Sequence, residues 1–80
     1  MSPLIQFKKF DVRSALKQGR EPYPGIRKRM DALQTAEGLA VIAPFLPAPL
    51  IEKLGSEGFK SKVERAGDGS WATYFWREAD

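Results

Sequence analysis

The amino-acid sequence predicts an α+β two-layer sandwich, in which four strands form a mixed sheet and two helices lie on one face of it. Three observations lead to this fold class. Strand-like apolar runs alternate with amphipathic stretches, Pro22-Tyr23-Pro24 and Pro47-Ala48-Pro49 each open one such stretch, and the chain closes in an aromatic hairpin. Proline fits the first turn of a helix, where its missing N–H would lack a partner anyway. The expected order is therefore β-α-β-α-β-β, and right-handed crossovers place both helices on one face.

The first half of the chain provides a strand, a helix and a second strand. A first strand is predicted over residues 4–12, followed by a polar connection over residues 13–21. The first helix begins at Pro22, and its pattern fades over residues 34–38. Its apolar side chains follow helical spacing at Tyr23, Ile26, Met30 and Leu33. Residues 39–43 are continuously apolar, as expected of an interior strand.

The second half provides the other helix and the hairpin. The second helix begins near Pro47 and stops at Gly58, a residue suited to a left-handed cap. Residues 59–64 alternate between apolar and charged side chains, which indicates a half-exposed strand. The turn Gly67-Asp68-Gly69 tolerates positive φ, and residues 70–77 return as the last strand.

One set of apolar side chains is expected to form the core between the helices and the sheet. The members on the helices are expected to be Ile26, Met30, Leu50, Ile51 and Leu54. They should pack against three members on the strands, Val41, Val63 and Phe75. Truncating Leu54 or Ile51 to alanine should cost about 2 to 5 kcal/mol of folding free energy.

Composition narrows the chemistry before any motif is considered. The 80 residues fit a single domain over residues 1–80, with no cysteine and no histidine. Disulfides, thiolate or imidazole metal sites, Ser-His triads and cysteine nucleophiles are therefore excluded, and we expect no cofactor and no metal. No carboxylate pair stands in an apolar setting that would raise a pKa, so we expect no enzyme. The chain lacks a signal-peptide-like region and a membrane-spanning run, which favours a cytoplasmic protein.

The last strand gives the first candidate site. Alternation places Trp71 and Phe75 on one face of this strand and Tyr74 and Trp76 on the other, so both faces carry aromatic side chains. One set should pack beneath the helices, and we expect Tyr74 and Trp76 to lie on the open face, at least partly exposed. The other members of this candidate interaction surface are Phe7, Lys60 and Lys62. Aromatic residues of this kind are enriched at protein interfaces, and beside cations they can also stack nucleobases. The alternative interpretation is a satellite cluster that only stiffens the sheet.

The second candidate is an anion-binding or partner-binding corner. Arg13, Lys17 and Arg20 are expected near the N-terminus of the first helix, whose dipole favours negative charge. The prolines there remove two backbone donors. Arg13 has a competing structural role, because it could pair with Asp11 or Glu21.

Several short motifs, in this order, resemble a known family. They are Phe10-Asp11-Val12-Arg13, Arg20-Glu21-Pro22 with Ile26-Arg27-Lys28, the apolar strand, the Gly58-Phe59 step and the aromatic hairpin. Together they resemble the TusA/SirA-like sulfur-carrier fold, and most closely its cysteine-less uncharacterised branch, the domain of unknown function 2249 family. The resemblance covers roughly residues 7–77, and it favours Trp71 and Phe75 as the side chains of the last strand that pack beneath the helices.

The resemblance implies a fold more than a chemistry. The sulfur carriers act through a cysteine in a Cys-Pro-x-Pro motif at the start of the first helix, where the helix N-terminus favours a thiolate. Here Gly19 stands at the cysteine position and Arg20 at that of the first proline, while Pro22 matches the second. Persulfide transfer through the family's nucleophile is therefore excluded, but a docking surface can persist.

These observations favour a small non-catalytic protein-interaction or regulatory module. The resemblance implies a hemerythrin-like or sulfur-handling protein as the partner, and the module itself is expected to be a monomer or a weak homodimer. The alternative is a weak RNA or DNA binder that uses the open face, and a sulfur-transfer-related accessory protein ranks third. Nucleic acid is disfavoured because the net charge is only +3 and the densest cationic run, Arg27-Lys28-Arg29, points in different directions on a helix.

Overall fold

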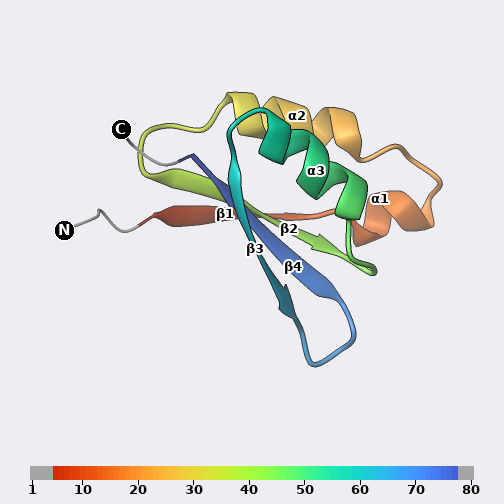
Figure 1. Cartoon of the computed structure of the whole chain (residues 1–80). Helices are drawn as coiled ribbons and strands as arrows, with labels where there is room; N and C mark the ends of the chain where they lie inside the picture. Colours follow the sequence, from red (N-terminus) through yellow and green to blue (C-terminus); the bar gives the residue numbers. More distant parts are fainter. Residues whose placement is uncertain (1–4, 78–80) are drawn as a thin grey trace.

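The computed structural model describes residues 5–77, which form four strands and three helices (Figure 1). In chain order these are β1 (Gln6–Asp11), α1 (Arg13–Lys17), α2 (Tyr23–Asp31), β2 (Glu37–Ala43), α3 (Ala48–Ser56), β3 (Lys60–Arg65) and β4 (Trp71–Trp76). The strands form a mixed sheet with the helices packed on one side, which confirms the predicted fold class. The predicted start of the first strand at Leu4 lies outside the described residues.

The sheet has the strand order β1-β2-β4-β3. β1 and β2 are parallel, and β4 is antiparallel to both β2 and β3. A parallel pair needs a crossover connection, which α1 and α2 provide. The closing hairpin then inserts β4 beside β2, so these two strands occupy the centre of the sheet and β1 and β3 are its edges.

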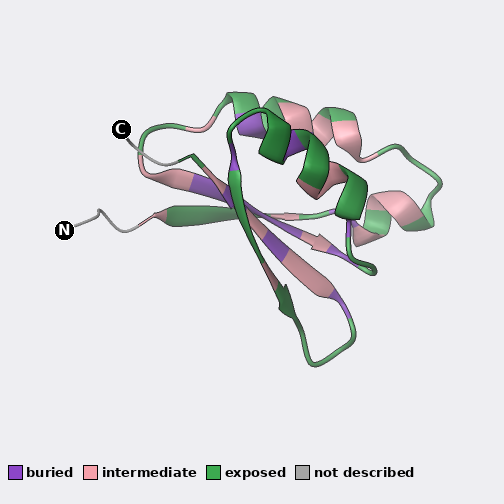
Figure 2. Cartoon of the chain, in the orientation of Figure 1, coloured by how far each residue is buried: buried purple, intermediate pink, exposed green. Residues whose placement is uncertain are grey.

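The core lies between the sheet and the two longer helices, where the buried segments of Figure 2 face one another. Leu39, Val41 and Phe75 form its floor and are each at most 1% exposed. The predicted helix members Ile26, Met30 and Leu54 are buried above them. The remaining predicted members are only half-buried, and these are Leu50, Ile51 and Val63. Of these three, Leu50 and Ile51 pack against the core.

The local signals in the sequence mark the element ends well. Pro22 and Pro47 immediately precede α2 and α3. Gly58 has φ +95°, and the Phe59 N–H returns to the Leu54 carbonyl at 3.1 Å, which closes α3 with the expected left-handed cap. In the β3–β4 turn, Gly69 adopts φ +88°.

The connection predicted over residues 13–21 is wrong in one respect, because it contains the short helix α1. Its first backbone N–H, that of Arg13, donates to the Asp11 carboxylate at 3.0 Å, and the Leu16 N–H donates to the Val12 carbonyl at 3.0 Å. Val12 and Leu16 both pack in or against the core. A helix of five residues offers a single apolar i, i+4 pair, too little for a periodic signal.

Candidate functional site

The sheet face away from the helices carries an aromatic row at one end. The register places one residue from each strand side by side in the order Phe7, Gly38, Trp76 and Lys60. Glycine occupies the β2 position, so Phe7 on the edge strand can lean over β2 toward β4. The ring centroid of Phe7 lies 6.0 Å from that of Trp76, in an edge-to-face arrangement.

The neighbouring row extends this cluster. Its members, in the same strand order, are Lys9, Ala40, Tyr74 and Lys62. The Tyr74 ring lies 5.0 Å from the Phe7 ring, also edge to face. Phe7 is 38% exposed, whereas Tyr74 and Trp76 are half-buried. We call Phe7, Tyr74 and Trp76 the open-face cluster, and edge-to-face pairs of this kind stabilise by about 0.5 to 1.5 kcal/mol beyond area burial.

Three lysines flank the open-face cluster. Lys9 lies on the β1 side, and Lys60 and Lys62 lie on the β3 side, all three exposed. Among residues 5–77, the ion pair recorded for these lysines joins Lys62 Nζ to Glu64 at 3.8 Å. The surface therefore combines apolar rings at its centre with positive charge on two sides.

The structure thus brings together all five residues that the sequence assigned to the interaction surface. Trp71 and Phe75 lie on the opposite face of β4, as predicted, with Phe75 fully buried. Two members of the surface were missed, Lys9 and Gly38. Neither could be assigned from the sequence alone, because each becomes a neighbour of the rings only once β1 is known to pair with β2.

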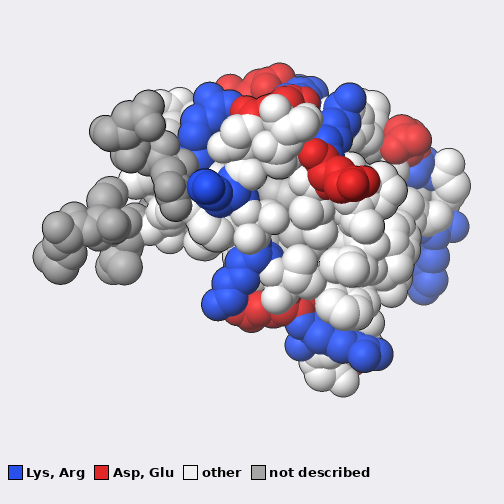
Figure 3. All heavy atoms as spheres, in the orientation of Figure 1, with Lys and Arg blue, Asp and Glu red and all other residues white. Residues whose placement is uncertain are grey.

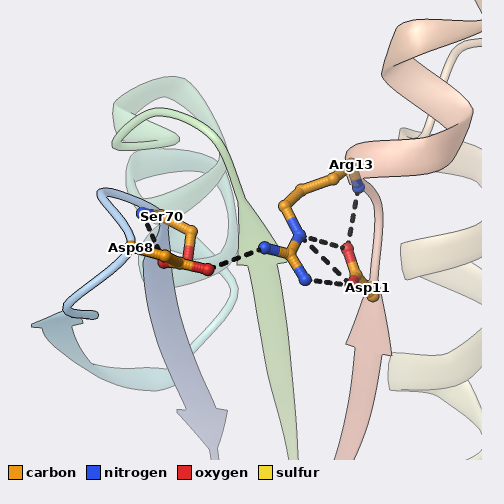
Figure 4. A network of polar contacts seen from close by, with 4 residues as sticks. All are labelled: Asp11, Arg13, Asp68 and Ser70. Atoms are coloured by element: carbon orange, nitrogen blue, oxygen red, sulfur yellow. Dashed lines mark hydrogen bonds and ion pairs between the residues drawn. The ribbon is translucent and has the colours of Figure 1, made fainter.

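The second candidate, the corner of Arg13, Lys17 and Arg20, is arranged differently from expectation. Arg13 opens α1, and its guanidinium donates to both carboxylate oxygens of Asp11, the shortest contact being 2.7 Å (Figure 4). It also reaches Asp68 in the β3–β4 turn at 3.2 Å. Asp68 in turn accepts hydrogen bonds from the backbone N–H and hydroxyl of Ser70.

This network gives Arg13 the structural role that the sequence left open. The Arg13 hydrogen bonds lower the pKa of Asp11 from 3.8 to about 2, and Ser70 is the main cause of a lowered pKa of Asp68. The guanidinium therefore ties the end of β1 to the distant hairpin turn. Its charge is already shared between two carboxylates.

The other two cations of the corner do not converge with Arg13 on a helix N-terminus. Lys17 is exposed at the end of α1, and Arg20 is exposed in the following loop. The first long helix, α2, instead has an acidic side chain at its start, because Glu21 Oε1 accepts the Tyr23 N–H at 3.3 Å. Anion binding at this corner stays a prediction.

Two further features bear on the chemistry. Within residues 5–77 there is no cluster of three or more carboxylates placed to hold a metal ion. In the same part of the chain, no helix has the length and apolar character needed to cross a membrane.

Comparison with known proteins gives a family and no activity. A family model described as an uncharacterized conserved protein (DUF2249) matches residues 9–77. No curated protein matches the chain. No solved structure matches it either.

Proposed function

The chain belongs to the DUF2249 family of uncharacterised conserved proteins, and we propose that it is a non-catalytic interaction module whose open sheet face binds a partner protein. The observation that carries the proposal is the open-face cluster. Three aromatic rings, one of them 38% exposed, gather on a sheet face that the helices leave uncovered. Protein interfaces are enriched in such rings, which bury a large area at low cost in side-chain entropy.

The charges around the cluster specify the chemistry of the partner. Lys9, Lys60 and Lys62 surround the rings, and a nearby carboxylate, Glu64, pairs with Lys62 alone. A segment with an apolar or aromatic anchor between acidic side chains complements this surface. Charged groups at the rim contribute mainly to the association rate and to partner choice, whereas the buried rings contribute most of the affinity.

The family resemblance supports a more specific form of the proposal. Apart from the short helix α1, the elements follow the β-α-β-α-β-β order that the resemblance implies, which supports the proposal, and the absence of cysteine removes the sulfur-carrier nucleophile. We therefore propose a cytoplasmic module that retains a carrier-like docking role without carrying sulfur, with a hemerythrin-like or sulfur-handling protein as its partner. Intact-mass measurement after incubation with a persulfide donor should show no added sulfur.

Single-stranded RNA or DNA is the second candidate, because rings beside lysines can stack bases. The geometry favours it less. Phe7 packs edge to face against both Tyr74 and Trp76, so part of each ring is already covered by a neighbour. Three lysines would neutralise few phosphates, and binding should be weak and should fall steeply as salt rises.

Peptide selection tests the proposal directly. A random peptide library is selected on the wild-type protein, and the enriched peptides are titrated against the variant Tyr74→Thr/Trp76→Gln. We expect acidic peptides with an apolar anchor, and at least tenfold weaker binding to the variant, which corresponds to about 1.4 kcal/mol. The matched control is Phe45→Ser/Leu46→Ser, which removes two exposed apolar side chains elsewhere on the surface.

Two results would contradict the proposal. Equal binding of the selected peptides to wild type and to a folded Tyr74→Thr/Trp76→Gln variant would place the interaction surface elsewhere. Submicromolar binding of oligo(U) or oligo(dT) at physiological salt would favour the nucleic-acid function instead. Circular dichroism of both double variants verifies that each remains folded.

A further inference from the structure

A second apolar surface lies at the opposite side of the fold from the open-face cluster, where α2 and α3 begin. A hollow of about 270 Å³ opens there, lined by apolar side chains that include Val12, Ile26 and Leu50. Phe45 forms part of its wall and is 51% exposed, and the adjacent Leu46 is 43% exposed. We call this hollow with its two protruding side chains the Phe45 groove.

The protruding side chains are held on a stiff loop. Pro44 and Pro47 bracket the Phe45-Leu46 pair, and each proline restricts its own φ. The Leu46 carbonyl accepts the Ala48 N–H at 2.9 Å, which fixes the loop to the start of α3. Binding would therefore order little additional backbone, so the entropic cost of using this loop as a contact is low.

The charges of the groove are balanced. Its lining includes one acid, Glu21, ahead of α2, and one base, Lys53, on α3. Both lie near Tyr23, because Glu21 accepts the Tyr23 N–H and Lys53 Nζ lies 5.4 Å from the centroid of the Tyr23 ring. Figure 3 shows a broad uncharged area over the β2–α3 loop, with an acidic group at its border over α3.

We propose that the Phe45 groove is a dimerisation surface that binds a second copy of this chain. A two-fold contact requires one patch to carry both halves of the complementarity. This patch does so, since it has an apolar protrusion beside an apolar hollow and carries both an acidic and a basic group in its lining. In the dimer, Phe45 of each copy enters the hollow of the other, and Glu21 of each copy faces Lys53 of the other.

This dimer leaves the open face free, so it goes beyond the proposed function and does not depend on it. Three lysines flank the open-face cluster and one of them is paired with Glu64, so a two-fold contact there would bring an excess of positive charge together. The Phe45 groove has no such excess of one charge. Each module in the dimer could therefore still bind its own acidic segment.

Sedimentation velocity over micromolar to millimolar protein concentrations tests the proposal. We expect the wild-type chain to shift from monomer to dimer as concentration rises. Phe45→Ser/Leu46→Ser should weaken the dimer at least tenfold while the melting temperature stays close to that of wild type, because both side chains are exposed. The open-face variant Tyr74→Thr/Trp76→Gln serves as the control and should dimerise like wild type.

A charge exchange tests the two-fold geometry. Glu21→Lys or Lys53→Glu alone should weaken the dimer, and the double variant Glu21→Lys/Lys53→Glu should restore most of the loss. Glu21→Lys also removes the acceptor of the Tyr23 N–H, but that defect would persist in the double variant, so restoration reports the contact between copies. Glu52→Lys, at an exposed position of α3, makes the same charge change and should have little effect.

Other results of these experiments would overturn the proposed dimer or assign it to another surface. A chain that stays monomeric at millimolar concentration overturns the proposal. So does a dimer that survives Phe45→Ser/Leu46→Ser, or one that the charge exchange does not restore. A dimer lost in Tyr74→Thr/Trp76→Gln would assign self-association to the open face instead.

Discussion

Gly38 determines how closely the rings of the open-face cluster approach one another. A Cβ at this position would lie 2.5 Å from the Phe7 ring and 2.7 Å from the Phe75 carbonyl oxygen, both shorter than side chains tolerate. Gly38→Ala should therefore displace Phe7 and cost about 1 to 3 kcal/mol, as overpacking does. Urea denaturation measures the loss, and tryptophan fluorescence reports the altered cluster.

The matched control is Gly55→Ala. Gly55 lies within α3, and a Cβ there would meet nothing within 4 Å. Because alanine is the better helix former, this variant should be as stable as wild type or more so, by up to about 1 kcal/mol. A Gly38→Ala variant that matches Gly55→Ala would show that Phe7 does not pack over β2.

Thr73 carries a second residue-scale prediction. Its side chain is fully buried beneath the helices, and its hydroxyl oxygen finds no hydrogen-bond partner within the described part of the chain. An unpaired buried hydroxyl is costly, so Thr73→Val, which keeps the shape, should raise the free energy of unfolding by about 1 kcal/mol. Thr73→Ser, which keeps the hydroxyl and removes a methyl group, should lower it. If valine destabilises the protein, the hydroxyl is hydrogen-bonded after all.

The Asp11–Arg13 pair predicts how stability depends on pH. The folded-state pKa of Asp11 is about 2, below its ordinary value of 3.8, so its contribution to stability is complete above that ordinary value and is lost as pH falls toward the folded-state value. Asp11→Asn should therefore be less stable than wild type at neutral pH, and the two should converge in this acid range. Thermal denaturation at a series of pH values measures the difference, and a constant difference would contradict the assignment.

At the scale of elements, α3 contributes to the core mainly through one residue. Leu54 is fully buried, whereas Ile51 is half-buried, so the equal costs expected from sequence are revised. Leu54→Ala should cost about 2 to 5 kcal/mol, and Ile51→Ala should cost clearly less. Chemical denaturation of both variants measures the two costs. Equal losses would mean that α3 packs with a different face toward the sheet.

The elements that sequence analysis predicted correctly are those with local signals. Pro22 and Pro47 mark helix starts by their fixed φ, and Gly58 marks a helix end by its tolerance of positive φ. Each of these properties belongs to a single residue, so it can be read without knowing the fold. The helix α1 has no such signal, since its one apolar pair fits a loop equally well.

The candidate site could be predicted only in part from the sequence, because strand pairing brings several of its members together. Alternation along β4 placed Tyr74 and Trp76 on the same face, and the family resemblance favoured that face as the open one. The rows that bring Phe7, Gly38 and Lys9 beside them depend on the strand order, which joins residues far apart in the sequence. Likewise, the bond between Arg13 and Asp68 joins the start of α1 to the β3–β4 turn, and no local pattern indicates it.

The whole molecule presents two surfaces of different character. The open face combines aromatic rings with lysines, which suits a partner of opposite charge. The Phe45 groove combines a protrusion, a hollow and balanced charge, which suits a second copy. A small domain with one core can present both because its helices cover only one face of the sheet.

The two tryptophans allow the most direct test of the central claim, that the open face is the partner-binding surface. Trp76 belongs to the open-face cluster, whereas Trp71 lies on the other face of the same strand. In a two-dimensional nitrogen–proton NMR spectrum, each gives its own indole N–H signal. On titration with a selected acidic peptide, the Trp76 signal should shift together with backbone amides of β1, β2 and β4, while the Trp71 signal stays in place. A shifted Trp71 signal with an unchanged Trp76 signal, or shifts confined to α2 and α3, would contradict the claim.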